Sequence, residues 1–489
     1  MSTTFPLRSR IPIACAGILA GSLLLGLSLL DAWLLVAIPT LAVVALIVSV
    51  RPTWALWTGL LLLFFGNASL SGSWEGSSRL HVWGRLLPTV AIGLLTLGFI
   101  FKSSLGHGLG KLRGKSLIAA YGAFCAVLVL SGLYNESSIQ SLFISFCIYF
   151  RYPLFFIILI NTDLDLVFYR RMLLAFVFLS LLQIPISLYE THVLGSGVLG
   201  SLGHNHGVVA ITLLCQCVLL AKWLSGQRRR TVYPILSAAL LIPALLGDIM
   251  IGVVLFPILI AYLLWKAYGL RRFANSLQSL LRLVFLGTFI SLIVLMLYPK
   301  VGGYLNVLSN IRTVGGYRPS LDWRDPAVAS FASIGRLTII PLSFPLLLDD
   351  PIRLVWGFGP EAAYRGRFAD GTTGCVCREL RGMGILCRGS QVFKSLMEFG
   401  LLGVFVQAFP FLFLWRSIGK RLRRMKVQQD RLLWLLFETS CFFHIVLAVW
   451  YIGAWRLDWY SFPFWLISAA AYSRAYSQEG TVVLGEPRG

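Results

Sequence analysis

The sequence is poor in charged residues, and poorest in acidic ones. Only 13% of its 489 residues are Asp, Glu, Lys or Arg, and 20 acidic residues stand against 42 Lys and Arg. Histidine is also scarce, with six residues. Because 57% of the chain is hydrophobic and its mean hydropathy is +0.79, the composition excludes a soluble globular protein.

Long apolar runs fill most of the chain. A helix needs about 20 apolar residues to cross ~30 Å of hydrocarbon, and about fourteen runs reach or approach that length. They lie at 11–30, 32–50, 53–66, 85–101, 116–134, 141–160, 171–189, 207–224, 232–247, 249–266, 282–298, 393–415, 432–450 and 459–473. If short runs such as 53–66, 232–247 and 459–473 are re-entrant or interfacial, the count falls to about twelve. No A-x-A-like cleavage site follows the first run, so we expect it to remain as a span.

One long polar segment interrupts these runs, and it divides the chain. Residues 299–392 carry eleven Lys and Arg and seven Asp and Glu, which a bilayer cannot hold. We therefore predict an all-α fold, a polytopic transmembrane helical bundle of about 12–14 spans with one large extracytoplasmic loop that contains short helices. The expected parts are an N-terminal bundle of about 11 spans at 1–298, the loop at 299–392, C-terminal spans at 393–476 and a disordered cytoplasmic tail at 477–489.

The excess of positive charge has a topological explanation. Lys and Arg gather in alternate connections, as the positive-inside rule requires, whereas the connections at 135–140 and 190–206 contain neither. This pattern predicts cytoplasmic N- and C-termini and argues against nucleic acid as a partner. The cations of the loop at 299–392 have two interpretations: a solvated surface, or a basic surface for an anionic substrate.

Three cysteines, Cys375, Cys377 and Cys387, lie in this loop, where oxidation is possible. A disulfide from Cys387 to one of the other two would leave one thiol over. A zinc site would need a fourth ligand, and the neighbouring sequence offers none, so we expect no metal.

Arg151 stands near the middle of the apolar run at 141–160. A guanidinium group inside a membrane costs several kcal/mol unless it faces water or a partner. It could form a structural ion pair, for example with Asp248. Alternatively, the span could have other ends than 141–160, so that Arg151 does not lie near its middle. Arg151 could also bind an anion in an outward cavity, since the planar guanidinium donates two parallel hydrogen bonds to a phosphate.

A second candidate is the pair His204 and His206, within Gly-His-Asn-His-Gly at the start of the run at 207–224. Two imidazoles at the membrane rim could transfer protons or hydrogen-bond a sugar. The same residues could equally form an interfacial polar turn without a function in chemistry.

Several short segments in and just after the loop form a recognisable pattern. Gly335-Arg336-Leu337 is followed by Asp349-Asp350-Pro351 and by Trp356-Gly357-Phe358-Gly359-Pro360-Glu361. Gly389-Ser390 then precedes Gly400-Leu401-Leu402-Gly403 by nine residues, with Glu398 between them. In this order and spacing they resemble the outer-loop signature of the O-antigen ligase and O-antigen polymerase superfamily. One departure is Gly389, which stands where the family has a histidine.

The resemblance implies a function. Members of this family transfer a glycan from an undecaprenyl-pyrophosphate carrier to an acceptor sugar at the outer face of the bacterial inner membrane, without a metal or other cofactor. The chain would then be a metal-independent glycosyltransferase of O-antigen, exopolysaccharide or capsule synthesis. Fixed cations would stabilise the leaving pyrophosphate, and the candidates are Arg151, Arg336, Arg381 and Arg388. The candidates for accepting the acceptor's proton are His204, His206 and Glu398.

The expected partners are the lipid-linked oligosaccharide, membrane lipid, and a chain-length regulator and flippase of the same pathway. Absence of the ligase histidine favours a polymerase over a ligase. Two other functions stay open. A transporter or flippase of lipid-linked sugars would also have many spans and a buried arginine, although such proteins usually have repeated halves. A scaffold of an export complex could dock through the basic connection at 416–431.

Overall fold

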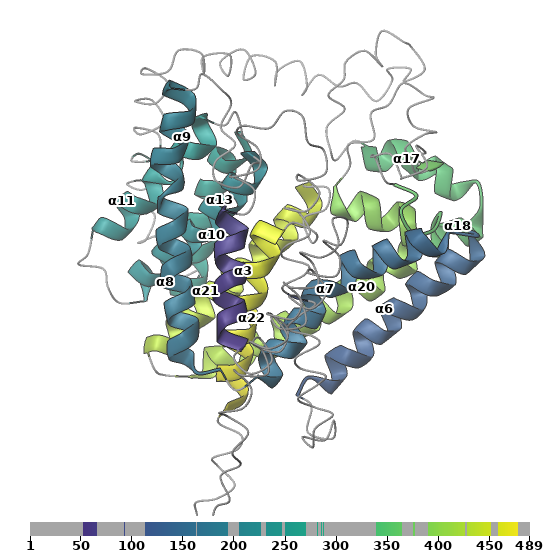
Figure 1. Cartoon of the computed structure of the whole chain (residues 1–489), viewed down its shortest axis with the longest axis horizontal. Coiled ribbons are helices and arrows are strands. Elements are labelled where there is room, and N and C mark those ends of the chain that lie inside the picture. The colour runs from purple at the N-terminus through teal and green to yellow at the C-terminus, as the bar shows by residue number, and fades with distance from the viewer. Residues whose placement is uncertain are drawn as a thin grey trace, which may run out of the picture.

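The structure is a computed structural model of the chain. It describes residues 52–65, 92, 113–162, 164–193, 205–225, 231–246, 250–269, 281, 285, 287, 339–363, 375–376, 390–425, 428–450 and 458–477. Of these, 89% lie in helices and none lies in a strand (Figure 1). The expected all-α class is thereby confirmed for the part of the chain described.

Six of the described helices are long and apolar enough to cross a membrane. They are α6 (Lys115–Tyr134), α7 (Ile139–Asn161), α8 with α9 (Leu166–Leu181 and Gln183–His192), α10 (Asn205–Leu224), α20 (Gln391–Arg424) and α21 (Gln428–Trp450). These helices indicate a multi-pass membrane protein. The expected runs at 11–30, 32–50, 85–101 and 282–298 lie almost wholly outside the described residues, so the total of 12–14 spans stays a prediction.

The other helices are shorter or less apolar. They are α3 (Pro52–Phe65), α11 (Val232–Ala239), α12 (Ile242–Leu246), α13 (Met250–Tyr268), α17 (Ile339–Leu348), α18 (Pro351–Trp356) and α22 (Asp458–Ser477). The expected run at 232–247 is not one helix but two. Helix α12 has Pro243 in its first turn, where a missing N–H costs nothing, so the break falls before it.

Polar side chains fix where several helices begin. Ser138 accepts a hydrogen bond from the backbone N–H of Ser141 at 3.2 Å and caps α7. Asp165 accepts one from the N–H of Phe168 at 2.7 Å and caps α8. Each cap satisfies an N–H group that the first turn of a helix leaves without a partner in the helix.

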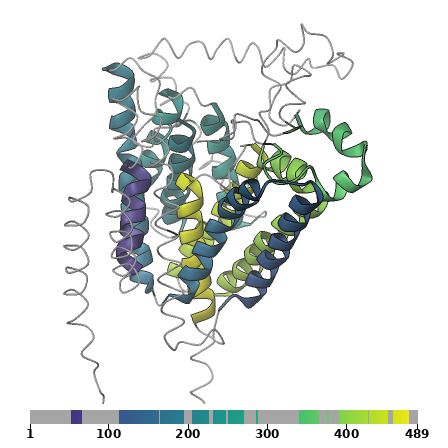
Figure 2. The same cartoon turned by 45° about the vertical axis from the view of Figure 1, so that its right-hand side comes forward.

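The helices form two groups, and the main hydrophobic cluster contains residues of both. Helices α8 to α13 with α3 lie on one side, α6, α7 and α20 lie tilted on the other, and α21 and α22 run between them (Figures 1 and 2). Helix α10 is the most enclosed of the six long helices, because 89% of its membrane-spanning segment Gly207–Leu224 is buried, and it packs against α8, α11, α13, α21 and α22. The short helices α17 and α18 cover one end of the α6–α7–α20 group.

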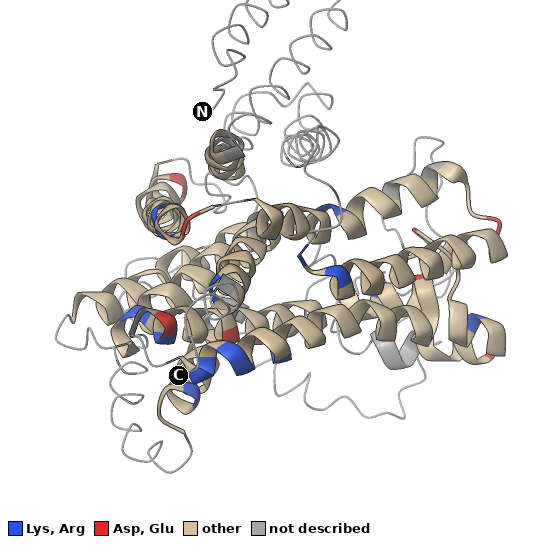
Figure 3. Cartoon of the chain, turned by 90° about the horizontal axis from the view of Figure 1, so that it is seen from below, with Lys and Arg blue, Asp and Glu red and all other residues tan. Residues whose placement is uncertain are grey.

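The other end of the bundle collects basic residues (Figure 3). The N–H of Arg113, just before α6, donates to Asn161 at the end of α7 at 2.8 Å. Arg431, near the start of α21, donates to the carbonyl of Ala267 at the end of α13 at 3.0 Å. The basic ends of helices far apart in the sequence therefore meet at one face, which is the arrangement that the alternation of charge predicts.

Candidate functional site

The candidate site is built around a kink in α20. Ser390 caps the helix, its Oγ accepting a hydrogen bond from the N–H of Phe393 at 3.1 Å. At Gly400 the backbone leaves the helical region, with φ 65° and ψ −165°. The predicted span at 393–415 falls within α20, and the kink divides this helix into a short segment before Gly400 and a longer one that continues to Arg424.

Backbone groups of the preceding loop satisfy the carbonyls that the kink releases. The N–H of Phe358 donates to the carbonyl of Met397 at 2.7 Å, and the N–H of Gly359 donates to the carbonyl of Glu398 at 3.0 Å. The hydroxyl of Ser131 in α6 also donates to the Glu398 carbonyl, at 3.1 Å. Within a membrane such groups must find partners inside the protein, so the turn at 356–360 and the kink stabilise each other.

Two glycines allow this close approach. Gly357 has φ 73°, and a Cβ atom there would lie 2.5 Å from the backbone of Glu398 and Phe399. A Cβ atom on Gly400 would overlap the carbonyl of Val355. The two backbones are therefore in direct contact at positions where only glycine fits without strain.

The end of α6 holds the same turn from the other side. Ser131 donates to the carbonyl of Trp356 at 2.7 Å as well as to that of Glu398. The side-chain amide of Asn135 donates to the carbonyl of Gly357 at 3.2 Å. The turn thus lies clamped between α6 and the kink of α20.

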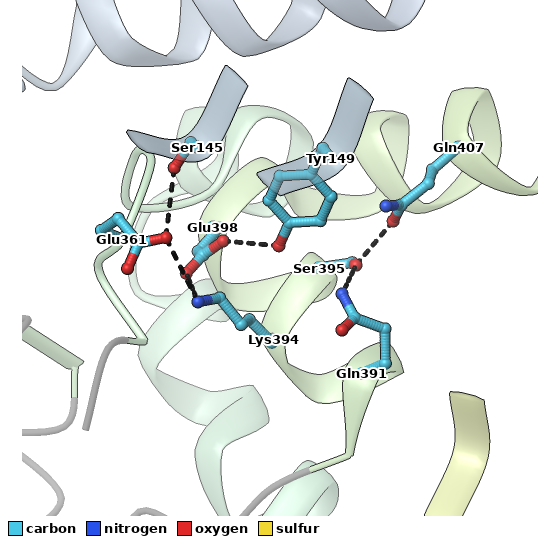
Figure 4. A network of polar contacts seen from close by, with 8 residues as sticks. All are labelled: Ser145, Tyr149, Glu361, Gln391, Lys394, Ser395, Glu398 and Gln407. Atoms are coloured by element: carbon cyan, nitrogen blue, oxygen red, sulfur yellow. Dashed lines mark hydrogen bonds and ion pairs between the residues drawn. The ribbon is translucent and has the colours of Figure 1, made fainter. Parts of the chain in front are cut away.

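This clamp positions a cluster of charged side chains (Figure 4). The ammonium group of Lys394 lies 3.0 Å from Oε1 of Glu398 and 3.4 Å from Oε1 of Glu361. The hydroxyl of Tyr149 in α7 donates to Oε2 of Glu398 at 2.8 Å, and that of Ser145 donates to Oε1 of Glu361 at 3.3 Å. Lys394, Glu361 and Glu398 are at most 1% exposed. Glu361 lies in a turn and has φ 62°.

A second polar row crosses the kink beside this cluster. The amide of Gln391 donates to the hydroxyl of Ser395 at 3.2 Å, and that hydroxyl donates to Oε1 of Gln407 at 2.6 Å (Figure 4). Ser395 stands before Gly400 and Gln407 after it. The row therefore ties the two segments of α20 together on the side away from the turn.

Fixed ions at such a place have chemical consequences. Burying a charged group costs several kcal/mol unless an opposite charge and hydrogen bonds surround it, as they do for Lys394 and Glu398. A carboxylate held in this way keeps its lone pairs directed and can accept a proton from a hydroxyl group. Ionisable groups inside a membrane protein are functional candidates by default. Among the residues described, no group of three or more His, Cys, Asp and Glu side chains comes together to hold a metal ion.

The structure brings one of the predicted site residues into this cluster, Glu398. Arg151 lies elsewhere on α7: it is two residues beyond Tyr149, about 200° around the helix, and its guanidinium lies over the ring of Tyr152, 4.9 Å from the centroid. His206 stands in the first turn of α10, and its side chain is outside the description. His204, Arg336, Arg381 and Arg388 fall outside the described residues. The assigned roles of all seven stay predictions.

Sequence reasoning missed Lys394, Glu361 and Tyr149 as site residues. A signal for Lys394 was present, because it stands four residues before Glu398 within the apolar stretch at 393–402. Oppositely charged residues at this spacing lie on the same face of a helix and can pair. The contact with Glu361 joins residues 33 positions apart through a turn, and no local pattern indicates it.

Comparison of the chain with protein-family models and with curated proteins finds no match.

Proposed function

We propose that this protein transfers a glycan from a polyprenyl-pyrophosphate carrier to an acceptor sugar at the outer face of the membrane, as a polymerase or a ligase. The observation that carries the proposal is the buried cluster of Lys394, Glu361 and Glu398 at the point where the long loop returns into the bundle. Three segments that carry the resemblance meet there in space: the turn at 356–360, the Ser390 cap and the kink at Gly400.

The distribution of charge supports the orientation that this function needs. The cluster lies beside the connection at 135–140, which has no Lys or Arg, whereas the basic ends of α6, α13 and α20 gather at the opposite end. By the positive-inside rule the basic end faces the cytoplasm and the cluster faces outward. In a bacterial inner membrane the loop at 299–392 is then periplasmic, and both termini are cytoplasmic.

The proposed reaction forms a bond between the acceptor oxygen and the anomeric carbon of the donor sugar. The bond from that carbon to the pyrophosphate oxygen breaks, and its electron pair leaves with the pyrophosphate. The acceptor's proton passes to a carboxylate or imidazole, for which Glu398, His204 and His206 are the candidates. Arg151, Arg336, Arg381 and Arg388 are the candidates for stabilising the negative charge of the pyrophosphate, each contact contributing about 3 kcal/mol.

Glu398 is enclosed, so it can act as the base only if the acceptor displaces part of its cover. Transfer by purified protein in nanodiscs, with a lipid-linked oligosaccharide as donor, tests this role. Glu398→Gln keeps the shape of the side chain and its hydrogen bond from Tyr149, and we expect kcat to fall at least about 100-fold with KM little changed. Glu136→Gln, an exposed residue at the same end of the bundle and outside the segments that carry the resemblance, is the matched control and should retain activity. Undiminished transfer by Glu398→Gln removes Glu398 from the chemistry, and a wild-type protein that transfers no glycan contradicts the proposed function.

A flippase or transporter of lipid-linked sugars is the second candidate. Buried Lys–Glu pairs and the polar row of Gln391, Ser395 and Gln407 also fit a protein that moves a polar headgroup through a bundle. The same nanodisc preparation and proteoliposomes separate the two functions. An enzyme lengthens the glycan, whereas a flippase moves the lipid-linked sugar between leaflets without changing its mass.

A further inference from the structure

A large open cavity lies at the basic end of the bundle, far from the cluster of Lys394. Its volume is about 1300 Å³. It is lined by the end of α13, by α20 from Leu412 to its C-terminal end, and by the part of α21 from Arg431 to Glu438. Figure 3 shows the blue Lys and Arg segments gathered at this end.

The charge of the cavity is strongly one-sided. Among the described residues that line it, six are basic and one, Glu438, is acidic; the basic residues are Lys266, Arg416, Lys420, Arg423, Arg424 and Arg431. Glu438 is already neutralised, because Lys266 lies 2.8 Å from it and Trp415 donates to it at 3.1 Å. The lining therefore keeps five positive charges without an acidic counterpart among the described residues of the cavity.

Four of these cations project from the same part of α20. Arg416, Lys420, Arg423 and Arg424 are exposed, and within the described part of the chain none of the four forms an ion pair. Residues 416, 420 and 424 are spaced four apart, so they form one row along the helix. Their neighbour Arg421 behaves differently, because it points away and lies 3.9 Å from the ring centroid of Tyr476.

The lining also contains apolar and aromatic side chains. Leu412, Trp415, Trp265 and Trp434 lie there. From Leu412 to Arg424 the helix rises by about 18 Å. The cavity therefore offers cations at the membrane surface and apolar contacts toward the membrane interior, which matches a molecule with an anionic head and a hydrocarbon tail. Tryptophan is typical of this interfacial depth.

We propose that this cavity binds the phosphate-bearing headgroup of an anionic membrane lipid. The row of Arg416, Lys420 and Arg424 binds the phosphate oxygens, and the first part of an acyl chain lies against Leu412 and Trp415. Basic residues near the C-terminal end of a helix are also stabilised by the helix dipole. That effect requires neither a cavity nor apolar residues beside the cations, so it does not explain why both occur here. The proposal is independent of the glycan-transfer function.

Quenching of tryptophan fluorescence by brominated lipids tests the proposal. The full-length protein is reconstituted in phosphatidylcholine, and brominated phosphatidylglycerol or brominated phosphatidylcholine is titrated in. We expect preferential quenching by the anionic lipid. The double variant Arg416→Gln/Lys420→Gln should bind it about 30-fold more weakly, since each cation close to an anionic headgroup contributes about a fivefold factor.

The matched control is the double variant Arg170→Gln/Arg171→Gln. It removes the same charge from two exposed residues of α8 that do not line the cavity, and it should bind like the wild type. The charge-preserving variant Arg416→Lys should retain most of the preference, which separates lost binding from misfolding. Equal quenching by both lipids, or an equal loss in the control, overturns the proposal. Stabilisation by inorganic phosphate without any lipid preference also overturns it and indicates a site for a soluble anion.

Discussion

Lys394 and Glu398 form an ion pair at 3.0 Å, one turn apart on α20, with side chains that are 1% and 0% exposed. Glu361 reaches the same ammonium group from a turn that Gly357 and Gly359 shape. The ammonium group of Lys394 therefore links α20 to the turn that contains Glu361. This contact depends on ion pairing as well as on packing.

Removing that cation should destabilise the protein strongly. Lys394→Met leaves Glu361 and Glu398 facing each other without a positive charge between them, and we expect a loss of about 3–5 kcal/mol in the free energy of unfolding. The double variant Lys394→Met/Glu398→Gln also removes one of the two facing carboxylates and should recover part of that loss of stability. Thermal unfolding in detergent measures both. Lys420→Met, an exposed residue of the same helix, is the control. Equal stability of the single and double variants would contradict an electrostatic role.

The contact between the turn and the kink should tolerate no added side chain. We expect Gly400→Ala and Gly357→Ala each to cost more than about 2 kcal/mol, because both positions have positive φ and the new Cβ would overlap backbone atoms. Gly122→Ala in α6 is the matched control, since a Cβ atom there meets nothing within 4 Å. Unfolding midpoints of the three variants provide the measurement. A Gly400→Ala protein as stable as Gly122→Ala would show that the backbones are not in contact.

The positions of many helices follow from apolar run length alone. The run at 116–134 corresponds to Lys115–Tyr134, and the run at 207–224 to Asn205–Leu224. Such agreement is expected in a membrane, where every backbone group must be satisfied within its own helix. The kink at Gly400 lacks a signal of this kind, because its hydropathy is continuous with that of its neighbours. Hydrogen bonds from Phe358 and Gly359, distant in the sequence, permit it.

The candidate site could be predicted only in part, for a related reason. Glu398 was identified through the spacing of Ser390 and Gly400, and the structure gives those two residues their roles as cap and kink. Lys394 lies within a stretch that reads as apolar, and Tyr149 reads as an ordinary aromatic residue of a span. Their contacts with Glu398 depend on how α7 and α20 pack, which a periodic pattern does not specify.

Tyr149 provides a milder test of the same cluster. Tyr149→Phe keeps the aromatic packing against Phe124 and Phe399 but removes the hydrogen bond to Glu398. We expect the free energy of unfolding to fall by about 1–2 kcal/mol, because a hydrogen bond to a charged group stabilises a protein more than the average hydrogen bond between membrane helices does. Tyr134→Phe, at the exposed end of α6, should have no effect. Glycan transfer should fall together with stability if Tyr149 only positions Glu398, and full activity and stability in Tyr149→Phe would exclude that role.

The sidedness of the two ends can be tested with two introduced cysteines. Ile352 in α18 is 48% exposed and lies at the end that carries the turn, whereas Lys420 is exposed at the basic end. In a background where Cys375, Cys377 and Cys387 are replaced by Ser, a membrane-impermeant maleimide should label Ile352→Cys in intact spheroplasts. It should label Lys420→Cys only after the membrane is permeabilised. Both proteins should react fully in detergent, which controls for the reactivity of each thiol. Labelling of Lys420→Cys in sealed cells would place the basic end outside and reverse the orientation that glycan transfer at the outer face requires.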